Sequence, residues 1–147
     1  YRLGPARLAH CMRWIGQAEA ALDMMVARSL ERYSHGSLLA EKQGIQWMIA
    51  EMAAQVEAAR LLTYRAAALN DQGVRISKEA AMAKLFASEA AEKICSTAIQ
   101  TLGGYGVVND FPVERIYRDV RVCQIYEGTN QIQRMIIARE LMKKGAR

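Results

Sequence analysis

The segment IQWMIAEMAAQVEAARLLTYRAAALNDQG, residues 45–73, predicts the fold class of this chain. Its apolar residues recur at steps of three and four, the spacing that lines one face of an α-helix; they are Ile45, Met48, Met52, Val56, Ala59, Leu62, Ala66 and Leu69. The segment contains no proline and ends in Asn70–Gly73, a cluster of residue types that stop helices. We therefore predict one long amphipathic helix, with its methionines filling the core.

Similar apolar stripes lie on both sides of this segment. The stripe that precedes it consists of Leu8, Cys11, Ile15, Ala18, Leu22 and Met25. The first stripe that follows it consists of Met82, Phe86, Ala90, Ile94 and Ala98. After a glycine cluster comes a less regular stripe of Ile132, Met135, Ile136, Ala138 and Leu141. Ser34–Ser37 is expected to close the first helix and Gly103–Gly106 the third. Ser77 is predicted to cap the start of the third helix.

Four long helices with short connections predict an all-α fold, arranged as an up-down-up-down four-helix bundle. The less periodic segment Asn109–Tyr126 is expected to hold a short extra helix and a loop before the last helix. The length of 147 residues suits a single domain spanning 1–147. Because the chain lacks an initiator methionine, we expect it to be a domain cut from a longer protein.

The composition excludes several classes of protein. Apolar residues make up 52% and charged residues 24%, which is typical of a globular domain, and no apolar run reaches the length of a membrane span. Three separated cysteines and two histidines form no zinc pattern, and they favour reduced thiols in a bacterial cytoplasm or a mitochondrial matrix. The net charge of +5 permits a polyanionic partner, but nucleic acid is disfavoured because no Lys/Arg tract is present.

Gln100–Gly106, with the sequence QTLGGYG, is one of two segments that do not resemble simple connectors. A single glycine after a helix is a common C-cap. Three glycines within four residues indicate that the backbone is left bare so that another group can approach it closely. From spacing alone, an irregular cap and turn remains an alternative.

The second segment is Gln124–Gln131, with the sequence QIYEGTNQ, which places Glu127 between an aromatic residue and a glycine. A carboxylate held in a partly apolar pocket becomes a stronger base, and the backbone N–H groups that open the next helix suit an anionic ligand. Thr129 can cap that helix. The alternative is an ordinary glutamate near a helix start, favoured by the helix dipole.

Taken together, LGGYG (residues 102–106), RDVRVCQIYEGTNQIQR (residues 118–134) and the following ARE resemble the C-terminal signature of the acyl-CoA dehydrogenase family. The resemblance extends over the chain, through GPAR at Gly4–Arg7, LERYSHG at Leu30–Gly36 and the glutamine at Gln43. It implies a subunit with an N-terminal helical domain and a middle β domain before this bundle. It also implies FAD as cofactor and oxidation of an acyl-CoA thioester to a trans-2-enoyl-CoA, with electrons passing to an electron-transfer flavoprotein.

The resemblance assigns roles to individual residues. Glu127 matches the catalytic base that removes the α-proton, and substrate contacts are implied for Arg7, Tyr126 and Gly128. Contacts with FAD are implied for Thr129, Asn130 and Gln131 in the same subunit, and contacts with the FAD of a neighbouring subunit for Arg32, Gln43, Gln100, Thr101, Leu102, Gly103 and Gly104. Some relatives place the base just before the arginine of the first helix, where Ala6 of this chain cannot act.

The two histidines of the chain, its oligomeric state and its competing functions remain to be interpreted. His35 stands where many relatives have phenylalanine, and His10 is interpreted as structural rather than catalytic. The resemblance implies a homo-oligomer, a dimer or tetramer, formed through this domain. Competing functions are an acyl-CoA oxidase, a non-catalytic binding module and an oligomerisation bundle alone.

Overall fold

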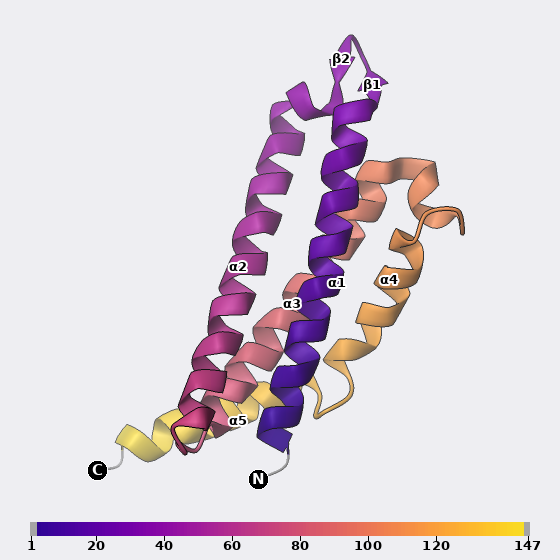
Figure 1. The fold of residues 1–147 in the computed structure, drawn as a ribbon. Coiled ribbons are helices and arrows are strands. Elements are labelled where there is room, and N and C mark those ends of the chain that lie inside the picture. Colours follow the sequence, from indigo (N-terminus) through magenta and orange to yellow (C-terminus); the bar gives the residue numbers. More distant parts are fainter. Residues whose placement is uncertain (1–2, 146–147) are drawn as a thin grey trace.

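A computed structural model describes residues 3–145 of the chain. Three long helices lie side by side and alternate in direction: α1 (Leu3–Glu31), α2 (Gln43–Asp71) and α3 (Ser77–Leu102) (Figure 1). A short helix, α4 (Val113–Arg121), packs beside α3, and α5 (Asn130–Gly145) crosses the end of the bundle where α1 begins. Three 3₁₀ turns complete the described chain, η1 (Leu39–Glu41), η2 (Gly103–Val107) and η3 (Val122–Gln124). The prediction of an all-α fold with four long helices and a short one before the last is confirmed.

α3 is the central element, since it contacts α1, α2, α4 and α5. Small side chains at Ala80, Ala83, Ala87, Ala91 and Ala98 are buried along it, and they let the neighbouring helices approach closely. Larger residues of α1, Trp14 and Met25, fill the space against this surface and are fully buried. The core therefore consists of one alanine-rich helix enclosed by larger apolar side chains.

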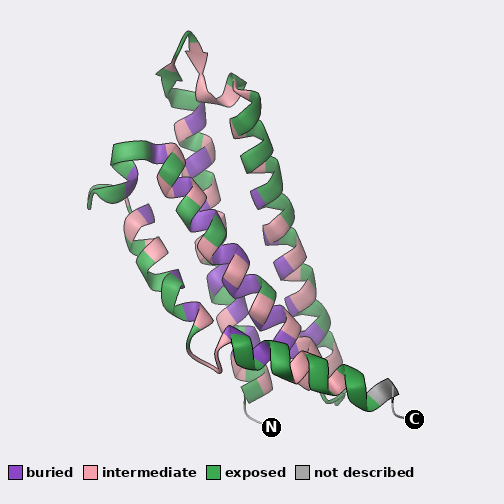
Figure 2. Cartoon of the chain, turned by 180° about the vertical axis from the view of Figure 1, so that it is seen from behind, coloured by how far each residue is buried: buried purple, intermediate pink, exposed green. Residues whose placement is uncertain are grey.

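The outer surfaces of α2 and α5 carry many exposed residues (Figure 2). Ile132, Met135 and Leu141, which the sequence assigned to the last apolar stripe, are all exposed on α5. α5 lies across the bundle end and packs mainly against α3, so most of its apolar side chains face away from this domain. Within the described residues no helix is both long and apolar enough to cross a membrane.

A two-residue hairpin joins α1 to η1, and the sequence did not predict it. β1 (Tyr33–Ser34) pairs antiparallel with β2 (Ser37–Leu38), and the loop residues His35 and Gly36 have φ values of 49° and 83°. Two successive left-handed residues are typical of the tight hairpin turn whose twist suits its strands. His35 is exposed there, and the Ser34 hydroxyl lies 2.8 Å from its Nδ1.

The ends of the helices agree with the predicted breakers, apart from one cap. α1 stops before Ser34, α2 stops at Asp71, and α3 stops at Leu102 with Gly103 left-handed at φ 63°. The prediction that Ser77 caps α3 is wrong, because Ile76 occupies the capping position and Ser77 is the first helical residue. The Ser77 hydroxyl instead accepts a hydrogen bond of 3.1 Å from Arg75 Nε.

Candidate active site at the start of the last helix

Glu127 lies in the turn between η3 and α5, at the end of the bundle where α1 begins. Its φ is 58° and that of Gly128 is 86°, so two successive residues are left-handed. A glutamate adopts this conformation only when its surroundings hold it there, because the β-carbon crowds the backbone. Such strain occurs mainly at functional sites, which makes the contacts of this turn informative.

Two buried side chains hold the backbone of this turn. Arg7 on α1 donates from Nε to the Glu127 carbonyl oxygen at 3.0 Å. Gln133 on α5 donates from Nε2 to the carbonyl oxygens of Glu127 at 3.2 Å and of Gly128 at 2.8 Å. Arg7 is 7% exposed and Gln133 is 0% exposed, so these bonds lie away from competing water. Burial lowers the pKa of Arg7, and the nearby Glu127 opposes that shift.

The hydrogen bonds that Arg7 and Gln133 make to this turn, here called the clamp, also require glycine at position 128. A β-carbon at this position would lie 2.9 Å from Gln133 Nε2 and 3.3 Å from Arg7 Nη2, and the φ of 86° is itself unfavourable for any other residue. Gln133 was missed by the sequence analysis. Nothing in the local pattern distinguishes it from other polar residues in the first turns of a helix.

The two oxygens of the Glu127 carboxylate have different surroundings. Its Oε1 lies 3.7 Å from His10 Nε2, and its side chain is 22% exposed. Its Oε2 is buried and has no hydrogen-bond partner among the described residues. A partly desolvated carboxylate with a free oxygen is a suitable proton acceptor for a ligand bound beside it.

Tyr126 packs behind this carboxylate. Its ring meets those of Trp14 and His10 edge to face, with centroids 5.8 and 5.0 Å away. Its hydroxyl accepts a hydrogen bond of 3.1 Å from Trp14 Nε1, and burial raises the pKa of the phenol. The aromatic residue before Glu127 therefore anchors the turn to α1.

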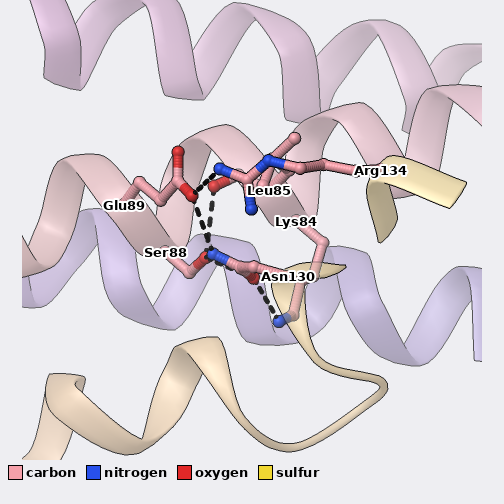
Figure 3. Close-up of polar contacts among 6 residues, drawn as sticks. All are labelled: Lys84, Leu85, Ser88, Glu89, Asn130 and Arg134. Carbon is pink, nitrogen blue, oxygen red and sulfur yellow. Dashed lines mark hydrogen bonds and ion pairs between the residues drawn. The ribbon is translucent and has the colours of Figure 1, made fainter. Parts of the chain in front are cut away.

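Asn130 fixes the beginning of α5 to α3. Its Oδ1 accepts hydrogen bonds from Lys84 Nζ at 2.7 Å and from the Ser88 hydroxyl at 3.1 Å, and its Nδ2 donates to Ser88 and Glu89 (Figure 3). Lys84 is 0% exposed, and burial lowers its pKa. The Asn130 side chain thus points into the protein, and only its backbone remains for the cofactor contact predicted from the sequence.

Thr129 and Gln131 stand on either side of Asn130. The Thr129 hydroxyl accepts from the Ile132 N–H at 3.4 Å, so it caps α5 as the sequence predicted. Gln131 is exposed. Both residues line a cleft of about 340 Å³ whose charged lining residues are Arg121, Arg134 and Glu89, and Arg134 forms an ion pair with Glu89.

The other predicted cofactor residues lie at the far end of α1. Arg32 and Gln43 are exposed beside the hairpin. Gln100, Gly103 and Gly104 are exposed around the end of α3. α1 contacts this region through Arg28, whose guanidinium lies 4.6 Å from the Tyr105 ring centroid. Leu102 is buried in the core and Thr101 donates to the Thr97 carbonyl, so their side chains face the protein. The structure therefore separates the predicted residues into two groups.

The glycines of η2 differ in how much space a β-carbon would have. A β-carbon on Gly106 would lie 2.6 Å from the Ile99 carbonyl oxygen and 2.9 Å from its Cα, both rigid backbone atoms, whereas one on Gly104 meets no heavy atom of the described chain within 4 Å. We expect Gly106→Ala to destabilise the domain by about 1–3 kcal/mol through overpacking. Gly104→Ala is expected to change stability by less than about 0.5 kcal/mol.

Urea unfolding of the two variants of the 147-residue chain measures this difference. Equal midpoints for Gly104→Ala and Gly106→Ala would contradict the close approach of η2 to α3.

A further cleft, of about 420 Å³, opens beside Arg7 where α1 begins. Leu3, Val74 and Ile76 provide apolar wall, and Arg75 adds an exposed cation. Arg75 could not be identified from the sequence, because its position next to the start of α1 depends on the turn that brings α2 and α3 together.

The model of the family "Acyl-CoA dehydrogenase, C-terminal domain" matches residues 1–142. The chain belongs to the acyl-CoA dehydrogenase family. It is 55% identical over 132 residues to cyclohexane-1-carbonyl-CoA dehydrogenase of Geobacter metallireducens, a match that covers 90% of this chain and 35% of the relative. It is 47% identical over 142 residues to caffeyl-CoA reductase-Etf complex subunit CarC of Acetobacterium woodii, covering 97% of this chain and 38% of that protein.

Solved structures of family members superpose closely on this domain. Butyryl-CoA dehydrogenase of Megasphaera elsdenii matches with a TM-score of 0.92 and 39% identity, covering 95% of this chain and 37% of the other. PigA with FAD and proline matches with a TM-score of 0.91 and 30% identity, covering 95% and 36%. The acyl-CoA dehydrogenase family is FAD-dependent, as the PigA structure illustrates. The chain spans little more than a third of the length of the relatives it matches.

Within an acyl-CoA dehydrogenase, the two groups of predicted residues have the chemistry that FAD requires. Arg32 is exposed, and a guanidinium is a suitable partner for a pyrophosphate. A β-carbon on Gly103 or Gly104 would meet no heavy atom of the described chain within 4 Å, so the backbone there is open. The start of α5 offers N–H groups and the side chains of Thr129 and Gln131. These residues fit an anionic dinucleotide, while Asn130 and Leu102 are committed to the core.

Proposed function

We propose that the full-length protein containing this domain oxidises an acyl-CoA thioester to a trans-2-enoyl-CoA, with Glu127 as the base. The observation that carries this proposal is the free, buried Oε2 of Glu127 in a clamped left-handed turn. The α-proton of a thioester is too weak an acid for water to remove at neutral pH, so a positioned and partly desolvated carboxylate is needed. Bound FAD supplies the acceptor of the β-hydride.

The clamp explains how the chain positions this base. Arg7 and Gln133 fix the backbone of Glu127, and the buried Asn130 fixes the helix that follows. The backbone that carries the carboxylate is therefore held from both sides of its turn. Preorganisation of this kind is what proton abstraction from carbon requires, because it keeps the acceptor oxygen within reach of the α-carbon.

The cleft beside Arg7 is the proposed entry for the coenzyme A part of the substrate. It opens next to the Glu127 turn, since Arg7 both lines the cleft and bonds to the Glu127 carbonyl. Its apolar wall suits the pantetheine chain, and Arg75 suits a phosphate. Gly128 lets Arg7 and Gln133 approach the turn, because a β-carbon there would lie 3.3 Å from Arg7 Nη2 and 2.9 Å from Gln133 Nε2.

We further propose that each domain contacts two FAD molecules. Arg7 and the end of α1 at Glu31 are separated by about 36 Å at 1.5 Å per residue, so the group around Thr129 and the group around Arg32 lie at opposite ends of one helix. This separation favours one FAD in the same subunit and another in a neighbouring subunit. An electron-transfer flavoprotein is the proposed electron acceptor, since the CarC relative is a subunit of a caffeyl-CoA reductase-Etf complex.

The proposed function is tested on the full-length protein loaded with FAD. A panel of acyl-CoAs of different chain lengths is added anaerobically while the absorbance of oxidised flavin is followed. Loss of that absorbance with one class of acyl-CoA supports the proposal and defines the substrate, and rapid reoxidation by dioxygen would indicate an oxidase. If no thioester reduces the flavin, the proposed function is wrong. The 147-residue chain alone is expected to be inactive.

Self-association of the isolated domain is a separate prediction. Trp47 and Leu61 lie two heptads apart on α2, which puts them on one helix face, and they are 62% and 58% exposed. Exposed apolar residues of this size are typical of an interface between subunits. We expect the domain to form dimers or larger assemblies at micromolar concentration in light scattering.

The double variant Trp47→Lys/Leu61→Lys is expected to shift the domain toward monomer. Val107→Lys/Val122→Lys adds the same two charges at exposed apolar residues outside α2 and serves as the control. A wild-type domain that runs as a clean monomer would contradict the proposed interface.

A further inference from the structure

His10 lies on α1, three residues after Arg7, and its ring faces the Glu127 carboxylate. Its Nε2 is 3.7 Å from Glu127 Oε1, and its side chain is 23% exposed. The other ring nitrogen, Nδ1, lies 3.3 Å from the Tyr126 hydroxyl. The imidazole therefore bridges the aromatic residue before the catalytic turn and the carboxylate itself.

The hydrogen-bond partners define the direction of this chain of groups. Indole Nε1–H is only a donor, so the Tyr126 oxygen accepts the bond from Trp14. Burial raises the pKa of Tyr126, so the phenol stays protonated and keeps one hydrogen to donate. The available strong acceptor is His10 Nδ1, at 3.3 Å.

The Cys123 thiol, which donates to the Asp119 carbonyl at 3.8 Å, is the other polar group near the Tyr126 hydroxyl. Burial raises the pKa of Cys123 to about 11, so the sulfur remains a thiol at neutral pH. A thiol sulfur is a weak acceptor compared with an imidazole nitrogen, and donation to His10 is favoured. A neutral imidazole that accepts at Nδ1 carries its proton on Nε2, the nitrogen that faces Glu127.

This arrangement leaves the two carboxylate oxygens with different roles. The Nε2–H of His10 is directed at Oε1, while Oε2 has no partner among the described residues. The separation of 3.7 Å is longer than a direct hydrogen bond. Catalytic contacts are often long without a ligand and shorten when the substrate excludes water. Closing the contact requires a rotation of the carboxylate toward His10.

We propose that His10 is a positioning residue for the catalytic base. The chain Trp14–Tyr126–His10 holds the Nε2–H against Glu127 Oε1, so that Oε2 is the oxygen presented to the α-proton. The inference rests on the proposed function, because it assigns His10 a role only if Glu127 acts as the base. The proposed role goes beyond the sequence-based interpretation of His10 as structural rather than catalytic.

The test compares three variants of the full-length, FAD-loaded protein. His10→Phe keeps a flat ring but removes both nitrogens, whereas His10→Gln keeps a side-chain N–H donor. Tyr126→Phe keeps the ring packed against Trp14 and removes the hydroxyl that orients His10. For each variant, the rate constant of anaerobic flavin reduction, the dissociation constant of the acyl-CoA and the isotope effect of α-deuteration are measured.

We expect His10→Phe to slow flavin reduction at saturating substrate by about tenfold to a hundredfold, as misplacement of a reacting group does. The dissociation constant is expected to stay within about threefold, and the α-deuterium isotope effect to rise because proton removal becomes more rate-limiting. His10→Gln is expected to recover most of the rate, and Tyr126→Phe to fall between the two. A residue that only stabilises the fold would not change the isotope effect.

Wild-type rate and isotope effect in His10→Phe, with Glu127→Gln inactive, would overturn the inference and leave the proposed function intact. Equal losses in His10→Phe and His10→Gln would also overturn it, because the N–H donor would then be irrelevant. If the wild-type protein is reduced by no acyl-CoA, the proposed function itself is wrong and the assignment of His10 is wrong with it.

Discussion

Replacing Glu127 with glutamine is expected to slow the reduction of flavin by acyl-CoA about a thousandfold in the full-length protein, within the range that general-base catalysis contributes. Glutamine keeps the size of the side chain, but its amide is a negligible base. The contacts that hold the turn go to the backbone carbonyls of residues 127 and 128, so they are unaffected. Stopped-flow absorbance of the flavin under anaerobic conditions measures the effect.

The same experiment needs evidence that the substrate still binds. Acyl-CoA is expected to perturb the oxidised flavin spectrum of Glu127→Gln with a dissociation constant close to that of the wild type. Glu57→Gln serves as the matched control, because Glu57 is an exposed partner of Arg60 on α2, away from the turn. If Glu127→Gln is reduced as fast as the wild type, another group is the base and the proposed mechanism fails.

Replacing Asn130 with leucine is expected to destabilise the 147-residue chain by about 3 kcal/mol. The substitution removes the oxygen that accepts from Lys84 Nζ and leaves a fully buried ammonium group without that bond. Removing one partner of a buried charged interaction usually costs about 3–5 kcal/mol, although the partner here is a neutral amide. Urea unfolding followed by circular dichroism measures the loss.

The effect of Asn130→Leu on the free energy of unfolding is expected to depend on pH. Burial lowers the pKa of Lys84 from its ordinary value of 10.5, so between the folded and unfolded pKa values the unfolded chain binds more protons and stability rises with pH. The deficit of Asn130→Leu is therefore expected to shrink as the pH rises past the lowered pKa of folded Lys84, because the ammonium group that Asn130 stabilises is then deprotonated. Ser88→Ala, which removes a neutral hydroxyl donor to the same oxygen, should cost only about 1 kcal/mol at neutral pH. Equal losses in the two variants would contradict a charge-dependent role for Asn130.

The helical part of the fold was predictable from local pattern. The stripe of residues 45–69 and the breaker at Asn70–Gly73 gave a helix that ends at Asp71, because burial of one helix face leaves a periodic record in the sequence. The stripe that begins at Ile132 was less informative. Its apolar residues are exposed within this domain, so their periodicity reflects a surface that the domain does not bury.

The candidate site was only partly predictable, because it depends on contacts between residues far apart in the sequence. Glu127 and Gly128 were singled out by their local composition and by the family signature. Gln133, Lys84 and Arg75 were not, since their roles come from the meeting of α5, α3 and α1 in space. His10 was given a structural role, because its distance of 3.7 Å to a residue 117 positions later leaves no trace in local spacing.

The length of α1 has an evolutionary consequence. Arg7 and His10 meet the Glu127 turn near one end of this helix, while the other end reaches the hairpin and the glycine turn. Inserting one residue between the ends would rotate everything beyond it by about 100° and shift it by about 1.5 Å. Even a seven-residue insertion, which nearly restores the helix face, would move the ends about 10.5 Å further apart. Relatives of this domain are therefore expected to vary at the exposed positions of α1 while keeping its length, and a comparison of their sequences should find substitutions there without gaps.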